Sequence, residues 1–126
     1  MPELTGIGDG AFEQTPLKHI GDMPKLKTIG DRAFTHTQLA QLGKMPSLTT
    51  IGERAFYGTQ LQKIFLPKSL QTVRYDAFKG CPLEKLSVET GAKFKCYCEN
   101  LASKLRLLKG VDVDGDRVWT FAHWQT

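Results

Sequence analysis

A period of 22 residues runs through most of this chain, and it constrains the fold more than any other feature. Apolar residues recur at this spacing in several columns, and an Ala-Phe pair recurs four times without exception. The main columns are Leu4, Leu26, Leu48 and Leu70; Ile7, Ile29, Ile51 and Val73; Phe12, Phe34, Phe56 and Phe78; Leu17, Leu39, Leu61 and Leu83; and Ile20, Leu42, Ile64 and Leu86. One such unit cannot bury its apolar side alone, so we expect the units to stack and to align these columns into continuous buried rows.

Each unit contains two apolar stretches separated by turn signals. Residues 61–67 alternate apolar and polar side chains and end in proline, which predicts a short strand on the inner wall of a parallel stack. Residues 48–52 end at a glycine that can turn the chain, and we expect them on the outer side. Ala55 and Phe56 then tuck in as a short turn or helical segment.

These units resemble the BspA-like leucine-rich repeat family, whose pattern reads roughly Leu-x-x-Ile-x-Leu-Pro, then Leu-x-x-Ile-Gly, then Ala-Phe-x-Gly-Cys. Residues 61–67, 70–73 and 77–81 match best, and the likeness covers residues 1–92. The first two units carry Gly-Asp-Met-Pro and Gly-Lys-Met-Pro where the strand should have its second apolar residue and proline, which predicts shorter or irregular strands there. The resemblance implies an α/β solenoid, a leucine-rich repeat array of four 22-residue units with short parallel strands.

The period stops after Gly91, and we expect residues 93–126 to cap the array. Apolar residues then fall at steps of three and four along a predicted amphipathic helix: Phe94, Cys98, Leu101, Leu105 and Leu108. Gly110 is a natural stop for this helix. Alternating residues around Asp114 and Gly115 predict a β-hairpin.

The first unit has no comparable cap, because residues 1–4 are already in phase with residues 23–26 and 45–48. Either repeats that precede this unit are missing, or a partner covers this end. Leu4 and Ile7 should then stack on nothing. Exposed apolar surface favours association, so we expect self-association through the first repeat.

Composition excludes several classes of protein. With 40% apolar and 24% charged residues, the 126-residue chain suits one soluble globular domain. It contains no apolar run of the roughly 20 residues that a membrane-spanning helix requires, and it begins with no signal peptide. A net charge of +4 does not require a nucleic-acid partner. The basic residues around the terminal helix, Lys93, Lys95, Lys104, Arg106 and Lys109, are read as its solvated face.

No arrangement of side chains predicts catalysis, a cofactor or a metal. Three cysteines do not form a disulfide framework, and Cys81 is interpreted as a buried thiol beside the phenylalanine column. On a helix, Cys96 and Cys98 would point to different faces and chelate poorly, although one of them could be exposed. Two further groups lack a site pattern: Asp112, Asp114 and Asp116, which have no EF-hand spacing, and His19, His36 and His123, which lie far apart.

The function that the sequence favours is protein binding by a non-catalytic repeat scaffold. Outward positions of the inner wall are predicted from the strand pattern, and those chosen as protein-binding are His19, Gln41, Lys63, Phe65 and Lys85, with Gly21, Gly43 and Ser87 beside them. Phe65 is either an exposed anchor or folded onto a neighbouring strand. The family resemblance implies adhesion or recognition by a larger surface or secreted protein. The alternative is a structural or regulatory repeat segment of a larger intracellular protein.

Overall fold

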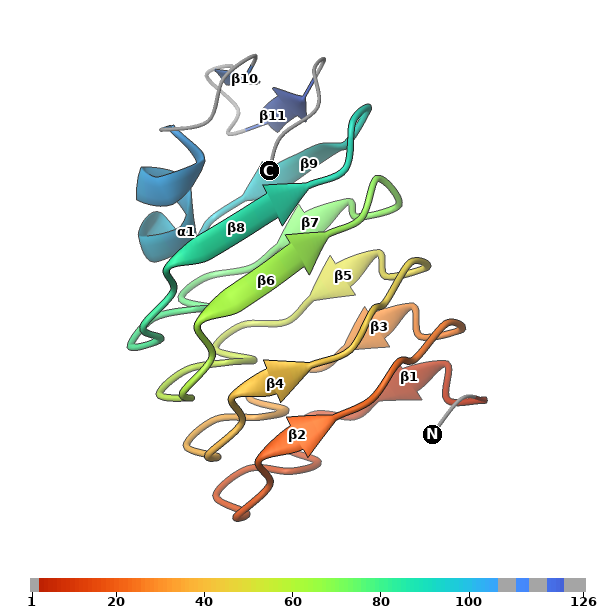
Figure 1. Cartoon of the computed structure of the whole chain (residues 1–126), viewed down its shortest axis with the longest axis vertical. Coiled ribbons are helices and arrows are strands. Elements are labelled where there is room, and N and C mark those ends of the chain that lie inside the picture. Colours follow the sequence, from red (N-terminus) through yellow and green to blue (C-terminus); the bar gives the residue numbers. More distant parts are fainter. Residues whose placement is uncertain (1–2, 107–110, 114–117, 122–126) are drawn as a thin grey trace.

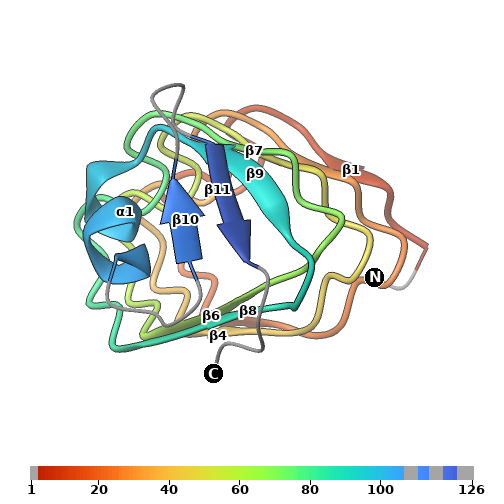
Figure 2. The same ribbon diagram turned by 90° about the horizontal axis from the view of Figure 1, so that it is seen from above.

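Residues 22 apart in the chain pair in register, and this pairing builds two walls of short parallel strands. The computed structural model describes residues 3–106, 111–113 and 118–121. Its solenoid rungs are stacked one above the next, with the chain crossing from one wall to the other and back in each rung (Figure 1). Seen from above, successive rungs overlap (Figure 2). The predicted leucine-rich repeat solenoid is therefore confirmed.

The rear wall in Figure 1 is a seven-stranded sheet in the order β1-β3-β5-β7-β9-β11-β10. Its strands are β1 (Gly6–Ile7), β3 (Thr28–Ile29), β5 (Thr50–Ile51), β7 (Thr72–Val73), β9 (Lys93–Cys96), β11 (Val118–Phe121) and β10 (Val111–Val113). The first five are parallel, whereas β11 runs antiparallel to both β9 and β10.

The front wall corresponds to the predicted inner wall and consists of two separate two-stranded sheets, β2-β4 and β6-β8. Its strands are β2 (His19–Ile20), β4 (Gln41–Leu42), β6 (Lys63–Leu66) and β8 (Lys85–Val88). The short β2 and β4 confirm that the first two units have abbreviated strands. In β6, exposed and buried side chains alternate, so each wall presents one face to solvent and one to the core.

Methionines explain how the first two rungs fill the core without the longer strand. The 22-residue period aligns Leu66 of β6 with Asp22 and Lys44, which are exposed. Met23 and Met45, one residue later, are buried instead, and their flexible side chains occupy the interior. The backbone reaches this position by passing through Gly21 and Gly43, so the strands end after two residues.

Between the two stretches of each rung, the Ala-Phe turn packs a phenylalanine onto the equivalent ring of the next rung. The ring centroids of Phe12, Phe34, Phe56 and Phe78 lie 5.5, 5.3 and 5.2 Å apart in succession, with interplanar angles of 4°, 11° and 7°. Backbone bonds support the stack, since the Phe34 N–H donates to the Ala55 carbonyl at 2.8 Å and the Phe56 N–H to that of Ala77 at 2.8 Å. The Ala-Phe column is therefore a stacked spine.

The last turn is closed by side chains rather than by another Ala-Phe turn. The Phe78 N–H donates to Cys98 Sγ at 3.3 Å, and Asn100 Nδ2 donates to the Phe78 carbonyl at 2.7 Å. Cys98 and Asn100 lie at the start of helix α1 (Glu99–Leu105), which buries Leu101 and Leu105 against the core. Helix α1 thus satisfies the backbone groups that the spine would otherwise leave open.

The C-terminal segment differs in part from its prediction. Phe94 was expected on the helix, but it lies in β9, where it is buried and stands in register with Trp119. The helix is shorter because residues 93–96 first add a strand to the rear wall. The antiparallel pairing of β10 with β11 confirms the hairpin, whereas Leu108 and Gly110 lie outside the described residues.

At the N-terminal end, the apolar side chains of the first rung are more buried than was expected. Ile7 is buried, which corrects the prediction that it stacks on nothing, because it packs on the second rung through the pairing of β1 with β3. Leu4, Phe12 and Leu17 are partly buried and pack against the core. Among the described residues, these three therefore contribute apolar surface at this end.

The close approach of the first two rungs predicts an asymmetry between two glycines. A methyl group on Gly43 would overlap the backbone of the first rung and lie within 2.6 Å of the Gly21 carbonyl oxygen, whereas one on Gly21 would meet nothing within 4 Å. We expect Gly43→Ala to lower the free energy of unfolding by about 1 to 3 kcal/mol or more, and Gly21→Ala to change it by less than about 0.5 kcal/mol. Urea denaturation of both variants measures the difference. Equal losses of unfolding free energy in the two variants would contradict the close contact between Gly43 and the backbone of the first rung.

Candidate binding surface

Four of the predicted binding residues form one row across the front wall. The strand register places His19 beside Gln41 and Lys63 beside Lys85, and all four side chains are exposed. Gly21 and Gly43 follow in the first two rungs, and Ser87 lies in register with Phe65. The structure thus brings these sequence-predicted residues together on one solvent-facing surface.

A break in this surface separates the second rung from the third. The Ala40 N–H donates to the Lys18 carbonyl at 2.8 Å, and the equivalent Glu84 N–H donates to Gln62 at 2.7 Å. Between the second and third rungs, the Gln60 N–H donates instead to the Leu39 carbonyl at 3.0 Å, and in the described part of the chain no strand pairing joins β4 to β6. Units with two-residue and four-residue strands meet here, so their backbones diverge.

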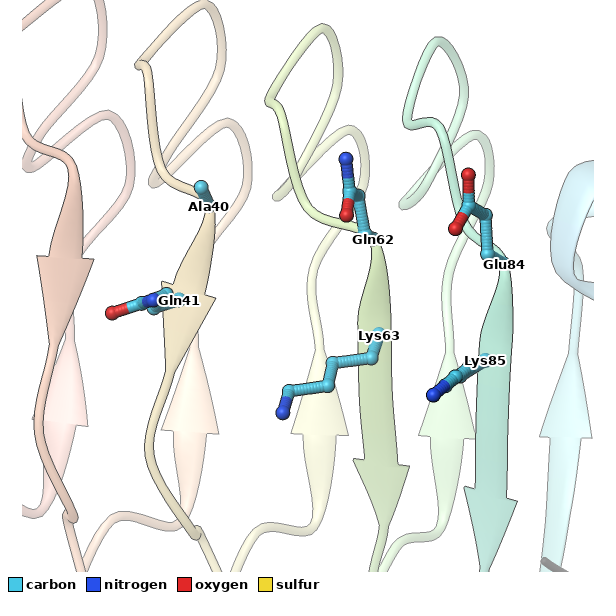
Figure 3. Close-up of a pocket in the computed structure, with 6 residues that line it drawn as sticks. All are labelled: Ala40, Gln41, Gln62, Lys63, Glu84 and Lys85. Atoms are coloured by element: carbon cyan, nitrogen blue, oxygen red, sulfur yellow. The ribbon is translucent and has the colours of Figure 1, made fainter.

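An open hollow of about 330 Å³ covers this region of the front wall. It is lined by Ala40, Gln41, Gln62, Lys63, Glu84 and Lys85, which come from the last three rungs (Figure 3). Figure 3 shows Gln62 and Glu84 pointing along their strands, whereas Gln41, Lys63 and Lys85 lean across the wall toward the preceding rung. The lining is polar and the volume is at the low end for a small-molecule pocket, which favours contacts with side chains of another molecule.

Charge on this surface is unbalanced. Lys63 and Lys85 stand in register on neighbouring strands, where like charges destabilise a sheet. The ion pairs found in the described residues lie elsewhere and join Lys25 to Glu3, Arg32 to Glu13, and Arg74 to Asp31. The two lysines therefore carry charges that are not neutralised by those pairs.

Comparison with known proteins gives one result. A family model described as a BspA type leucine-rich repeat region (6 copies) matches residues 1–102. The chain belongs to the BspA-type leucine-rich repeat family. The match passes the predicted end of the array at residue 92 and includes β9 and the start of helix α1. No curated protein and no solved structure matches the chain significantly.

Phe65 is the exposed aromatic residue of the front wall in this BspA-type array. Its side chain is 39% exposed, so it is an accessible apolar group among polar neighbours rather than a core residue. Exposed aromatic residues of this kind are common anchors in protein interfaces. Its neighbour in register, Ser87, is half-buried and leaves room on one side of the ring.

A second aromatic surface was missed by the sequence reasoning. Tyr75 and Tyr97 are 55% and 38% exposed and follow β7 and β9 in neighbouring rungs. Arg54 lies beside Tyr75, with its backbone N–H donating to the Tyr75 carbonyl at 3.0 Å and its guanidinium 5.9 Å from the Tyr57 ring centroid. The signal was a column that changes from acidic residues in the first three rungs to tyrosine in the fourth.

The family's cysteine position is buried, as predicted. Cys81 Sγ donates to the Phe56 carbonyl at 2.8 Å and lies 3.2 Å from Thr59 Oγ1. Burial raises the pKa of the Cys81 thiol to about 11, despite the opposing effect of its hydrogen bonds to Thr59. A thiol that remains protonated at neutral pH is a poor nucleophile and a poor metal ligand.

The expectation of an exposed cysteine near the C-terminus was wrong. Cys96 lies in β9 rather than on a helix, and both it and Cys98 are buried because they belong to the cap. Burial raises the pKa of Cys98 as well. Both thiols therefore have structural roles in the packing of α1 and the rear wall.

The remaining candidate site residues, which are the histidines, the aspartates and the basic residues, do not form a site in the part of the chain that the structure describes. Within the described residues, no three His, Cys, Asp or Glu side chains gather as a metal site, and no helix is long and apolar enough to cross a membrane. His36 packs edge-on against Tyr57 at 5.3 Å, and Arg106 lies 5.6 Å from the Trp119 ring centroid. Asp114, Asp116, Lys109 and His123 lie outside the described residues.

Lys93 and Lys95 project from β9 on the rear wall, while Lys104 belongs to α1. The basic residues that were grouped around a terminal helix are thus divided between a strand and a helix. The strand that carries Lys93 and Lys95 belongs to the rear sheet, and Lys63 and Lys85 belong to the β6-β8 sheet of the front wall.

Proposed function

We propose that the chain is a non-catalytic protein-binding module that contacts its partner through the front wall. The family suggests an interaction repeat module, because leucine-rich repeat solenoids are typically binding scaffolds rather than enzymes. The observation that carries the proposal is the exposed row of His19, Gln41, Lys63 and Lys85 beside Phe65, on both sides of the break between β4 and β6. Strand pairing and the buried spine hold the backbone that carries these side chains in place, so the backbone gains little order on binding.

Position-specific crosslinking tests which wall meets the partner. A photoreactive residue replaces Gln41 on the front wall and, as a matched control, Thr28 on the rear wall of the same rung; both are exposed and lie in two-residue strands. We expect the Gln41 position to capture a defined protein that the Thr28 position does not capture. The captured protein is then purified, and its affinity for the array is measured.

Phe65→Ala should weaken this affinity by about tenfold or more, as expected for a central aromatic anchor. Tyr75→Ala is the matched control, because Tyr75 is the more exposed aromatic residue and lies away from the front wall. Loss of affinity in Tyr75→Ala with none in Phe65→Ala would assign binding to the other surface and contradict the proposal.

The family resemblance also supports a finer proposal, that the module serves adhesion or recognition as part of a larger surface or secreted protein. Antibodies against the array should then label intact cells that produce the full-length protein. Labelling confined to permeabilised cells would contradict surface display and favour a structural or regulatory role inside the cell.

Self-association through the first rung is a separate proposal. Leu4, Phe12 and Leu17 are only partly buried there, and Phe12 stacks on Phe34 at 5.5 Å. Two copies that meet at this end would bury that apolar surface. Light scattering across a concentration series should show association of the chain, and Leu4→Glu should reduce it more than Phe65→Glu on the front wall. A chain that is monomeric at every concentration would contradict the proposal.

A further inference from the structure

The break between β4 and β6 carries an inference about the kind of partner, which rests on the front wall being the binding surface. Because β4 and β6 are not paired, the rungs separate and leave the hollow between Gln41 and Lys63. Lys63 leans across this break toward Gln41 (Figure 3). Lys63 and Lys85 thus both line the hollow, whereas the Gln41 amide points toward the first rung, away from Lys63 (Figure 3).

The two ammonium groups repel one another in this arrangement. Adjacent strands are about 4.8 Å apart, so lysines in register hold like charges close together. Glu84 follows the same wall, but it points along its strand (Figure 3) and forms none of the ion pairs found in the described residues. An anionic group placed between Lys63 and Lys85 would relieve the repulsion and accept hydrogen bonds from both lysines.

We propose that the hollow binds carboxylate side chains of an acidic protein segment, with Lys63 and Lys85 as its cationic contacts. The open shape of the hollow suits side chains that enter from a segment lying across the rungs. Phe65, on the same face of β6, lies next to this contact in the strand and would pack on an apolar residue of the same segment. A partner with this pattern of acidic residues beside an apolar one matches the charge and the shape of the wall.

A fluorescently labelled ten-residue glutamate peptide is the probe for this contact. We expect it to bind the wild-type chain in buffer of about 50 mM salt and to dissociate when the salt concentration is raised, since exposed charges are screened. The double variant Lys63→Gln, Lys85→Gln should weaken binding by about fivefold or more. Glu84→Gln should strengthen binding, because it removes a like charge beside the hollow.

The matched control is Lys27→Gln, Lys79→Gln, which removes the same net charge from exposed lysines outside the hollow. We expect it to change the affinity by less than about twofold. Absence of binding to the wild type, or equal weakening by both double variants, would overturn the inference. Tighter binding of heparin than of the peptide through the same two lysines would also overturn it, because the ligand would then be a sulfated polysaccharide.

The protein captured by crosslinking at Gln41 separates this inference from the proposed function. Weaker binding of that protein to the Lys63→Gln, Lys85→Gln variant than to the control variant supports both. If Phe65→Ala weakens binding but the lysine variant does not, the front wall still binds protein and the acidic-segment inference fails.

Discussion

Stacking of one phenylalanine on the next sets the arrangement on which the rest of this structure depends. The rings of Phe12, Phe34, Phe56 and Phe78 lie nearly parallel at centroid separations of 5.2 to 5.5 Å. This range matches offset stacking and is compatible with the spacing of about 4.8 Å between paired strands. Because the turns and the rear wall share one rung spacing, the columns of leucine and isoleucine align as well. Each rung depends on its neighbours, so the two ends need different solutions, a helix and hairpin at one and partly buried apolar residues at the other.

The outward faces are free to vary because the inward columns fix the fold. On the front wall, the change from two-residue to four-residue strands breaks the pairing between β4 and β6 without interrupting the spine. The break produces the hollow and separates the backbones around Lys63, which makes a polar recess in an otherwise regular surface. The proposed binding surface therefore lies where the repeat is least regular, while the spine behind it keeps the side chains in position.

The sequence predicted the repeat and the buried columns well, because a strict period links each residue to the same environment in every rung. It also predicted the solvent-facing row through Gln41 and Lys63. It could not predict how Met23 and Met45 replace the position of Leu66, since that depends on the backbone path through the glycines. The strand at Phe94 was missed because its apolar residues also fit a helical spacing, and pairing with β7 and β11 decides between the two. The hollow lies where a rung with a two-residue front strand meets one with a four-residue front strand. The sequence of a single unit does not show how its strand fits the strand of the next unit.

The most direct test of this account compares two phenylalanines of the same rung. Phe56 is fully buried in the spine, whereas Phe65 is 39% exposed on the front wall. In urea denaturation, Phe56→Ala should lower the free energy of unfolding by about 3 to 5 kcal/mol, as for other buried aromatic truncations, and Phe65→Ala by less than about 1 kcal/mol. A loss below about 1 kcal/mol for Phe56→Ala, or equal losses for both variants, would contradict the claim that the stacked spine holds the solenoid together.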